Sequence, residues 1–211
     1  MRFDDLLELI GNEPFFSSSL LGVVGVSSRH ARLQLVRWVH AGKLVRLRRG
    51  LYALNRPFRK VAPHPFLLAN CIRKASYVSL QSALAYHGMI PEHVPVVTSV
   101  TTGRPEEIRT ELGAFTFRHV RKPLFGGFQK VTVAPGQSAF LATPAKALLD
   151  LVYFTPGGDQ PAYIAELRLQ NASALTKQAL EDTARLFGGA KTDRAVAQIL
   201  AWMEAEAGRT P

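Results

Sequence analysis

The sequence of 211 residues predicts an α+β chain made of two differently patterned parts. In residues 1–60, three short stretches with apolar residues at helical spacing precede two β-prone runs that surround a glycine. In residues 61–211, short helical stretches flank several β-prone segments, and the pattern is helical again from Pro161 onward. We therefore expect one domain over 1–60, and a mixed α/β domain with a small sheet and a helical C-terminus over 61–211.

Three helices are predicted in the first part. The first has a single apolar face before Gly11, formed by Phe3, Leu6, Leu7 and Ile10. The serines of 17–19 offer an N-cap for a second, short helix that ends at Gly25. Ser27 or Ser28 caps a third helix, predicted over 29–41 and ended by Gly42. The inward side of this third helix is expected to consist of Ala31, Leu35, Trp38 and Val39.

A hairpin is predicted directly after the third helix. The β-prone runs 44–47 and 51–54 flank Arg48, Arg49 and Gly50, and a short glycine-containing loop between two such runs favours a tight turn. Three helices followed by a basic-tipped hairpin is the order of a winged helix-turn-helix. In that fold the third helix can enter the DNA major groove, which is about 12 Å wide. The hairpin, or wing, can reach the flanking phosphates or the minor groove.

The second part follows a proline-rich segment, 55–65, which is typical of a linker. Helices are predicted at 66–72, at 80–87 after a capping Ser79, and from Thr143-Pro144 through Leu151. Strands are predicted at 77–78, 94–101, 115–120, 128–133 and 137–141. The C-terminal helices are expected at 163–169, 176–187 and 192–206.

Charge is concentrated in the N-terminal part. The chain has a formal net charge of +10, and residues 1–60 hold 11 Lys/Arg against 4 Asp/Glu. No acidic residue occurs between Glu13 and Glu92, a stretch with 12 Lys/Arg. A solvated basic face is the alternative, but an acid-free basic block on this fold favours binding to the phosphates of duplex DNA. The residues predicted to bind DNA are Ser27, Ser28, Arg29, His30, Arg32, Arg37, Lys43, Arg46, Arg48 and Arg49.

Several classes of protein and site are disfavoured. The first residues lack the cationic segment of a secretory signal, and no apolar run approaches the roughly 18 residues of a membrane span. The single cysteine, Cys71, excludes an intrachain disulfide and a Cys-rich zinc site. We expect a cytoplasmic protein that does not bind membranes.

No catalytic motif is evident. The sequence has no phosphate-binding glycine loop, no HExxH and no GxSxG, and its histidines lack companions at metal-ligand spacing. Asp150, Asp159 and Glu166 could be proposed as a metal-nuclease site, but their spacing does not require one. Lys146 and Asp150 are four residues apart on a predicted helix, which favours an ion pair. We therefore expect no enzyme activity, no metal and no cofactor.

Four segments of the second part resemble the AbiEi family, the antitoxins of bacterial type IV abortive-infection toxin–antitoxin systems. They are YVSLQSALAYHGMIPE (77–92), TTGRP (101–105), LGAFTFRHV (112–120) and LATPAKALLDL (141–151). KLVRLRRGLYAL (43–54) looks like the family's wing, and the similarity spans nearly all of residues 17–154. One departure is visible: the family usually has a Glu before the Lys of the last motif, where this chain has Ala145.

The resemblance implies a repressor that binds inverted repeats in its own promoter. It also implies a C-terminal domain that opposes a nucleotidyltransferase-like toxin without a stable complex. Within the shared motifs, the residues predicted to serve antitoxin function are Ser79, Gln81, Tyr86 and Lys146. Two alternatives remain: a winged-helix regulator whose C-terminal domain senses a ligand or dimerises, and a nucleic-acid-processing enzyme. Neither the oligomeric state nor the operator follows from the sequence.

Overall fold

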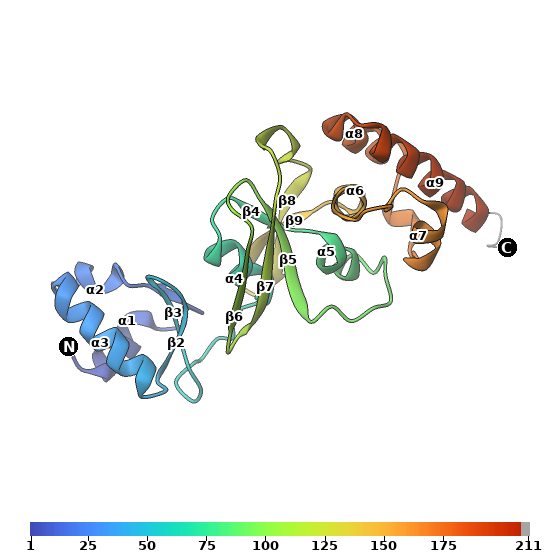
Figure 1. Cartoon of the computed structure of the whole chain (residues 1–211). Helices are drawn as coiled ribbons and strands as arrows, with labels where there is room; N and C mark the ends of the chain where they lie inside the picture. The colour runs from blue at the N-terminus through green and yellow to red at the C-terminus, as the bar shows by residue number, and fades with distance from the viewer. Residues whose placement is uncertain (208–211) are drawn as a thin grey trace.

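The computed structural model describes residues 1–207 and confirms the α+β class. The molecule is elongated, with a small N-terminal module at one end, a six-stranded sheet in the middle and the C-terminal helices at the other end (Figure 1). No helix in the described range is both long enough and apolar enough to cross a membrane.

The N-terminal module has the element order and sheet of a winged helix-turn-helix, as predicted. Its elements are α1 (Phe3–Ile10), β1 (Phe16–Ser17), α2 (Leu20–Val23), α3 (Ser28–His40), β2 (Leu44–Arg48) and β3 (Leu51–Leu54). The strands form an antiparallel sheet in the order β1-β3-β2, in which the β2–β3 hairpin is the wing. β1 was not predicted, because two residues are too few to show the alternation that indicates a strand.

The core of this module lies between α1, α3 and one face of the small sheet. α1 buries Phe3, Leu6 and Ile10, and α3 buries Ala31 and Leu35. The expected inward face of α3 is thus confirmed at its two central positions, while Trp38 and Val39 are half-buried beside them. Trp38 meets Phe3 edge-to-face, with ring centroids 5.4 Å apart, so it packs rather than offering a stacking surface.

The serines expected to cap α2 and α3 use their hydroxyls for other hydrogen bonds. Ser19 and Ser27 occupy the N-cap positions of α2 and α3, but neither side chain accepts a bond from a helix backbone N–H. The Ser19 hydroxyl donates to that of Ser17, 2.9 Å away, and the Ser27 hydroxyl lies 2.8 Å from Nδ1 of His30. The start of α3 is therefore fixed by a side-chain pair on its exposed first turn.

The second part is built on a six-stranded mixed sheet in the order β6-β7-β5-β4-β9-β8. Its strands are β4 (Ser76–Val78), β5 (Val96–Thr101), β6 (Glu106–Thr110), β7 (Gly113–His119), β8 (Phe128–Ala134) and β9 (Gln137–Ala142). β4 pairs with β9 and β5 pairs with β7 in parallel, whereas the other neighbours are antiparallel. The edge strand β6 was not predicted, because its sequence EEIRT is charged and mostly exposed.

Helices cover this sheet and extend beyond it. α4 (Pro65–Ile72) contacts β4, β5 and β9, whereas α5 (Leu80–Tyr86) and α6 (Pro144–Phe154) pack together and contact β5 and β9 respectively. The C-terminal helices are α7 (Pro161–Glu166), α8 (Lys177–Phe187) and α9 (Ala190–Ala207), of which α8 and α9 pack on α6. Short 3-10 turns occur at Lys122–Leu124 and Ala172–Ala174. Helix α6 begins as predicted, with Thr143 accepting from the Lys146 backbone N–H and proline in the first turn.

The wing is packed on both sides. Tyr52 and Leu54 face the core of the N-terminal module, while Leu47, Leu51 and Ala53 belong to the hydrophobic core of the second part. The segment expected to be a linker is also anchored, since the Gln137 side chain accepts from the His64 N–H and donates to the Ala62 carbonyl. A division into two domains at residue 60 stays a prediction; packing along the wing holds the two parts together.

Candidate nucleic-acid interface

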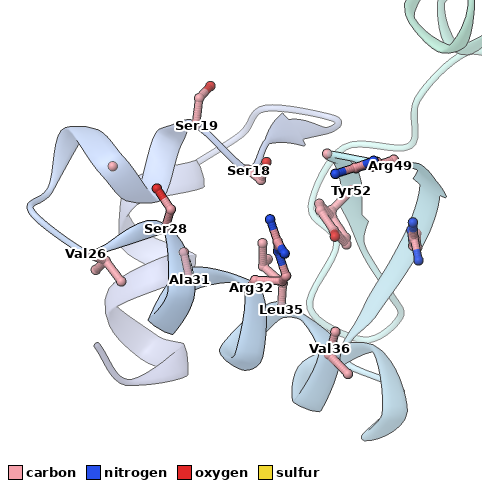
Figure 2. Close-up of a pocket in the computed structure, with 13 residues that line it drawn as sticks. Ser18, Ser19, Val26, Ser28, Ala31, Arg32, Leu35, Val36, Arg49 and Tyr52 are labelled. Atoms are coloured by element: carbon pink, nitrogen blue, oxygen red, sulfur yellow. The ribbon is translucent and has the colours of Figure 1, made fainter.

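A groove of about 570 Å³ lies between α3 and the wing (Figure 2). Its lining comes from α2, α3, the wing and the segments that precede them. The lining residues are Ser18, Ser19, Gly22, Val26, Ser28, Ala31, Arg32, Leu35, Val36, Arg46, Arg49, Gly50 and Tyr52. None of these described residues is acidic, so the groove carries positive charge only.

Three arginines from separate segments meet at this groove. Arg32 reaches from the second turn of α3 toward the wing, and Arg49 points from the wing turn toward α3 (Figure 2). Arg46 lines the groove from β2, where it is the exposed residue between buried Val45 and Leu47. The turn that carries Arg49 needs Gly50, whose φ of +80° is unfavourable for other residues.

The outer surface of α3 holds more of the predicted DNA-binding residues. Arg29, His30 and Arg37 are exposed, and Ser27 and Ser28 stand at the start of the helix. Lys43 is the exception: it is half-buried, and its Nζ lies 4.6 Å from the centroid of the Phe3 ring. A cation–π contact of this kind holds the ammonium against the helical core and outside the groove.

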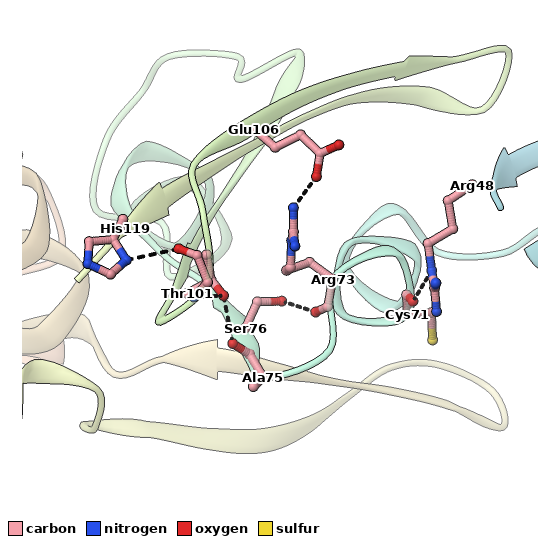
Figure 3. A network of polar contacts seen from close by, with 9 residues as sticks. Arg48, Cys71, Arg73, Ala75, Ser76, Thr101, Glu106 and His119 are labelled. Atoms are coloured by element: carbon pink, nitrogen blue, oxygen red, sulfur yellow. Dashed lines mark hydrogen bonds and ion pairs between the residues drawn. The ribbon is translucent and has the colours of Figure 1, made fainter. Parts of the chain in front are cut away.

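Arg48 is separated from its neighbour Arg49. Its Nε donates to the backbone carbonyl of Cys71, 3.3 Å away, so its guanidinium faces the second part of the molecule (Figure 3). Arg48 and Arg49 were predicted to form one basic tip, whereas the structure separates them. The β2–β3 register shifts between Arg46 and Arg48, so Arg48 leaves the groove side of the strand that Arg46 occupies, and this side of the wing lies against the second core.

Arg73, in the acid-free stretch between Glu13 and Glu92, is also used in contacts within the chain. Arg73 forms an ion pair with Glu106, and its carbonyl accepts from the Ser76 hydroxyl (Figure 3). Its guanidinium also lies 5.8 Å from the centroid of the Phe117 ring. The long acid-free stretch of sequence is therefore not one continuous surface. Its exposed positive charge is concentrated on α3 and on the groove side of the wing.

A second polar cluster is buried behind the large sheet. One carboxylate oxygen of Asp150 accepts from Lys146 Nζ at 2.6 Å, and the other accepts from the hydroxyls of Tyr77 at 3.0 Å and Ser79 at 2.7 Å. All four side chains are fully buried. The predicted ion pair is confirmed, but its burial and its two hydroxyl partners were not foreseen. The expected cap by Ser79 is wrong, because its hydroxyl is used by Asp150 instead of the α5 backbone.

Burial sets the protonation behaviour of this cluster. It lowers the pKa of Lys146 and raises the pKa of Asp150, and in each case the ion pair with the other residue acts in the opposite direction. Burial also raises the pKa of Tyr77, with a further contribution from the adjacent Asp150 carboxylate. The aromatic ring of Phe187 covers the Lys146 ammonium at 4.2 Å.

The four residues predicted to serve antitoxin function fall into two groups. Ser79 and Lys146 lie in the buried cluster and present no surface. Gln81 and Tyr86 are exposed on α5. Ala145, at the position where the resemblance implies a Glu, is buried beside Lys146.

Lys146→Met should extend the loss of stability with rising pH to higher pH than in the wild-type protein. Without the ammonium, burial keeps the Asp150 pKa above its ordinary value of 3.8, so the folded state holds a proton that the unfolded chain releases. The stabilisation is complete below the ordinary value and is lost as pH rises toward the raised folded value. The free energy of unfolding should fall by about 1.4 kcal/mol per pH unit within that window. Urea unfolding from about pH 5 to about pH 8 measures it.

Lys177→Met is the matched control for that experiment. Lys177 also precedes an acidic partner, Glu181, by four residues on a helix, but both side chains are exposed. Its replacement should leave the pH dependence of wild type unchanged. A Lys146→Met protein with the same pH profile as this control would contradict the buried ion pair.

Two of the three carboxylates considered for a nuclease site are engaged elsewhere. Asp150 is paired with Lys146, and Asp159 pairs with Arg194 at 2.7 Å. In the described range, no three His, Cys, Asp or Glu side chains are grouped as metal ligands. The His87 and His119 rings instead contact the backbone carbonyls of Ala142 and Gly103.

A comparison with known protein families found a match to the N-terminal module. A family model described as "Transcriptional regulator, AbiEi antitoxin" matches residues 4–55, which extend from α1 to the end of the wing. The motifs between residues 77 and 151 lie outside this match. No curated protein matches the chain. The winged helix-turn-helix of this chain is thus similar to that of the AbiEi antitoxin transcriptional regulators.

Proposed function

We propose that this protein is a DNA-binding antitoxin that represses its own type IV toxin–antitoxin operon, and that it does so in the cytoplasm. The supporting observation is the groove in which Arg32, Arg46 and Arg49 converge without an acidic neighbour among its lining residues. Guanidinium groups at such positions suit phosphate oxygens, to which they can donate two parallel bonds.

The geometry suggests how duplex DNA would be held. α3 would lie in the major groove, and the adjacent phosphate backbone would run between α3 and the wing. The hydroxyls of Ser18 and Ser28, which also line the groove, can add neutral donors to the phosphates. On an operator with inverted repeats, two copies would occupy the two half-sites.

The second part of the chain would oppose a nucleotidyltransferase-like toxin. Within its shared motifs, Gln81 and Tyr86 are open to contact with another molecule, whereas Ser79 and Lys146 would act by maintaining the fold. Such a protein should restore growth when co-expressed with the toxin encoded next to it. Gel filtration of the two proteins together should show no stable complex.

Salt dependence tests the DNA-binding proposal. Binding of the full chain to a duplex from its own upstream region should weaken as salt rises from about 0.05 to about 0.4 M, because counterions are released when phosphates are neutralised. Three arginine–phosphate contacts alone give a slope of log K against log salt of about −2.7. Absence of binding at the lowest salt, or a slope near zero, would refute the proposal.

One observation favours the alternative of a ligand-sensing regulator. An apolar cavity of about 400 Å³ lies among α4, β4, β8 and β9 and is lined by Cys71, Phe128 and Phe140. A small apolar molecule could occupy it. The neighbouring gene discriminates between the two functions, since a regulator of this second kind needs no nucleotidyltransferase-like toxin beside it.

A further inference from the structure

Two aliphatic side chains are exposed in the middle of the outer face of α3. Leu33 is 51% exposed and Val36 is 45% exposed. A helix turns by about 100° per residue, so Leu33 lies opposite the buried Ala31 and Leu35, and Val36 lies between Leu33 and the groove. Around the pair, the exposed residues of α3 are mostly basic: Arg29, His30, Arg32, Arg37 and His40.

Packing within the chain does not explain these side chains. Neither Leu33 nor Val36 belongs to the two hydrophobic cores formed by the described residues. Single exposed leucines are ordinary on protein surfaces. Here, however, two aliphatic residues three positions apart are flanked by arginines, on the helix that the DNA-binding proposal places in the major groove.

The surrounding charge indicates the occupant of this face. A partner must be strongly anionic at the rim of the contact and locally apolar at its centre. The DNA major groove has both properties, because phosphates line its edges and the C5 methyl group of thymine is the apolar feature of its floor. Val36 also lines the groove beside Arg32, so it stands where the base edges meet the phosphate backbone.

We infer that Leu33 and Val36 recognise the C5 methyl groups of thymines in the operator. Arg29 and Arg32 flank this apolar pair and contact neighbouring guanine edges or phosphates. This inference rests on the proposed DNA binding and adds to it a sequence preference: each half-site contains thymine at the positions that face the centre of α3.

Replacing thymine by deoxyuridine tests the inference, because this change removes the methyl group and keeps the base pairing. The full chain is titrated with the upstream duplex and with versions in which successive thymines are replaced. At the contacted positions the affinity should fall about fourfold per methyl group, the size expected for one buried methyl. In Leu33→Ala and Val36→Ala variants, the same replacements should have little further effect.

Two further variants serve as controls. Val23→Ala removes an even more exposed valine, 82% exposed on α2, and should keep the full deoxyuridine penalty. Arg49→Ala should weaken binding to thymine and deoxyuridine duplexes equally. The inference is overturned if deoxyuridine has no effect at any position, or if its effect persists unchanged in Leu33→Ala and Val36→Ala. Either result leaves salt-dependent DNA binding intact, whereas failure to bind every duplex would contradict the proposed function as well.

Discussion

Asp150→Ala is expected to destabilise the protein by about 3–5 kcal/mol, because it leaves the buried Lys146 ammonium without its partner. The hydroxyls of Tyr77 and Ser79 lose their acceptor in the same change. For a chain of this size, the midpoint of thermal unfolding should fall by about 6–20 °C. Urea and thermal unfolding followed by circular dichroism measure the loss.

A double variant separates charge from packing in this cluster. Lys146→Met with Asp150→Asn removes both charges, fills much of the same volume and keeps an amide oxygen as acceptor for Tyr77 and Ser79. It should be clearly more stable than Asp150→Ala, since buried ion pairs can often be replaced by neutral groups at little cost. Asp182→Ala, which removes an exposed helix carboxylate, should change stability by no more than about 0.5 kcal/mol. Asp150→Ala as mild as this control would show that the cluster is solvated.

Only part of the buried cluster could be predicted from the sequence. The spacing of Lys146 and Asp150 on one helix predicts their ion pair, because residues four apart on a helix are neighbours. Tyr77 lies 73 residues away from Asp150 in the sequence, and the contact exists only because β4 lies against α6. Local periodicity contains no information about such a pairing, and therefore none about the burial of the pair.

The winged helix could be predicted because its signals are local in the sequence. The apolar spacing of α3 and the glycine between β2 and β3 are local signals that tertiary packing did not override. Such signals predict that Arg32, Arg46 and Arg49 lie on α3 and the hairpin. They do not predict the groove itself, which depends on how the wing folds back against α3.

The different positions of Arg48 and Arg49 in the candidate interface could not be predicted from the sequence either. They are adjacent, identical and equally suited to phosphate, and nothing in the sequence distinguishes them. Tertiary packing distinguishes the two arginines. The wing packs against the second part of the chain, which directs Arg48 to the Cys71 carbonyl and leaves Arg49 at the groove. Substitutions can therefore separate the predicted DNA-binding residues that contact DNA from those that are held by contacts within the chain.

Replacing Arg32, Arg46 and Arg49 together by Ala should weaken DNA binding by about 100- to 1,000-fold at 0.1 M salt. Each lost phosphate contact reduces the magnitude of the salt slope by about 0.9, so the triple variant should lose about 2.7 from the slope of wild type. Because the three side chains line an open groove, their removal leaves both hydrophobic cores unchanged. Binding titrations over a range of salt concentrations measure the affinity and the slope together.

The comparison of Arg49→Ala with Arg48→Ala makes the prediction specific to this geometry. Arg49→Ala alone should reduce the slope by about 0.9, whereas Arg48→Ala should leave the slope unchanged and act on stability through the lost bond to Cys71. Both variants remove one positive charge from the wing, at adjacent positions, so a general loss of attraction to DNA would affect them equally. If the two variants have the same slope, the groove between α3 and the wing is not the path of the phosphate backbone. If only Arg49 matters, the backbone passes on the α3 side of the wing, and the contacts that hold Arg48 against α4 orient the wing for it.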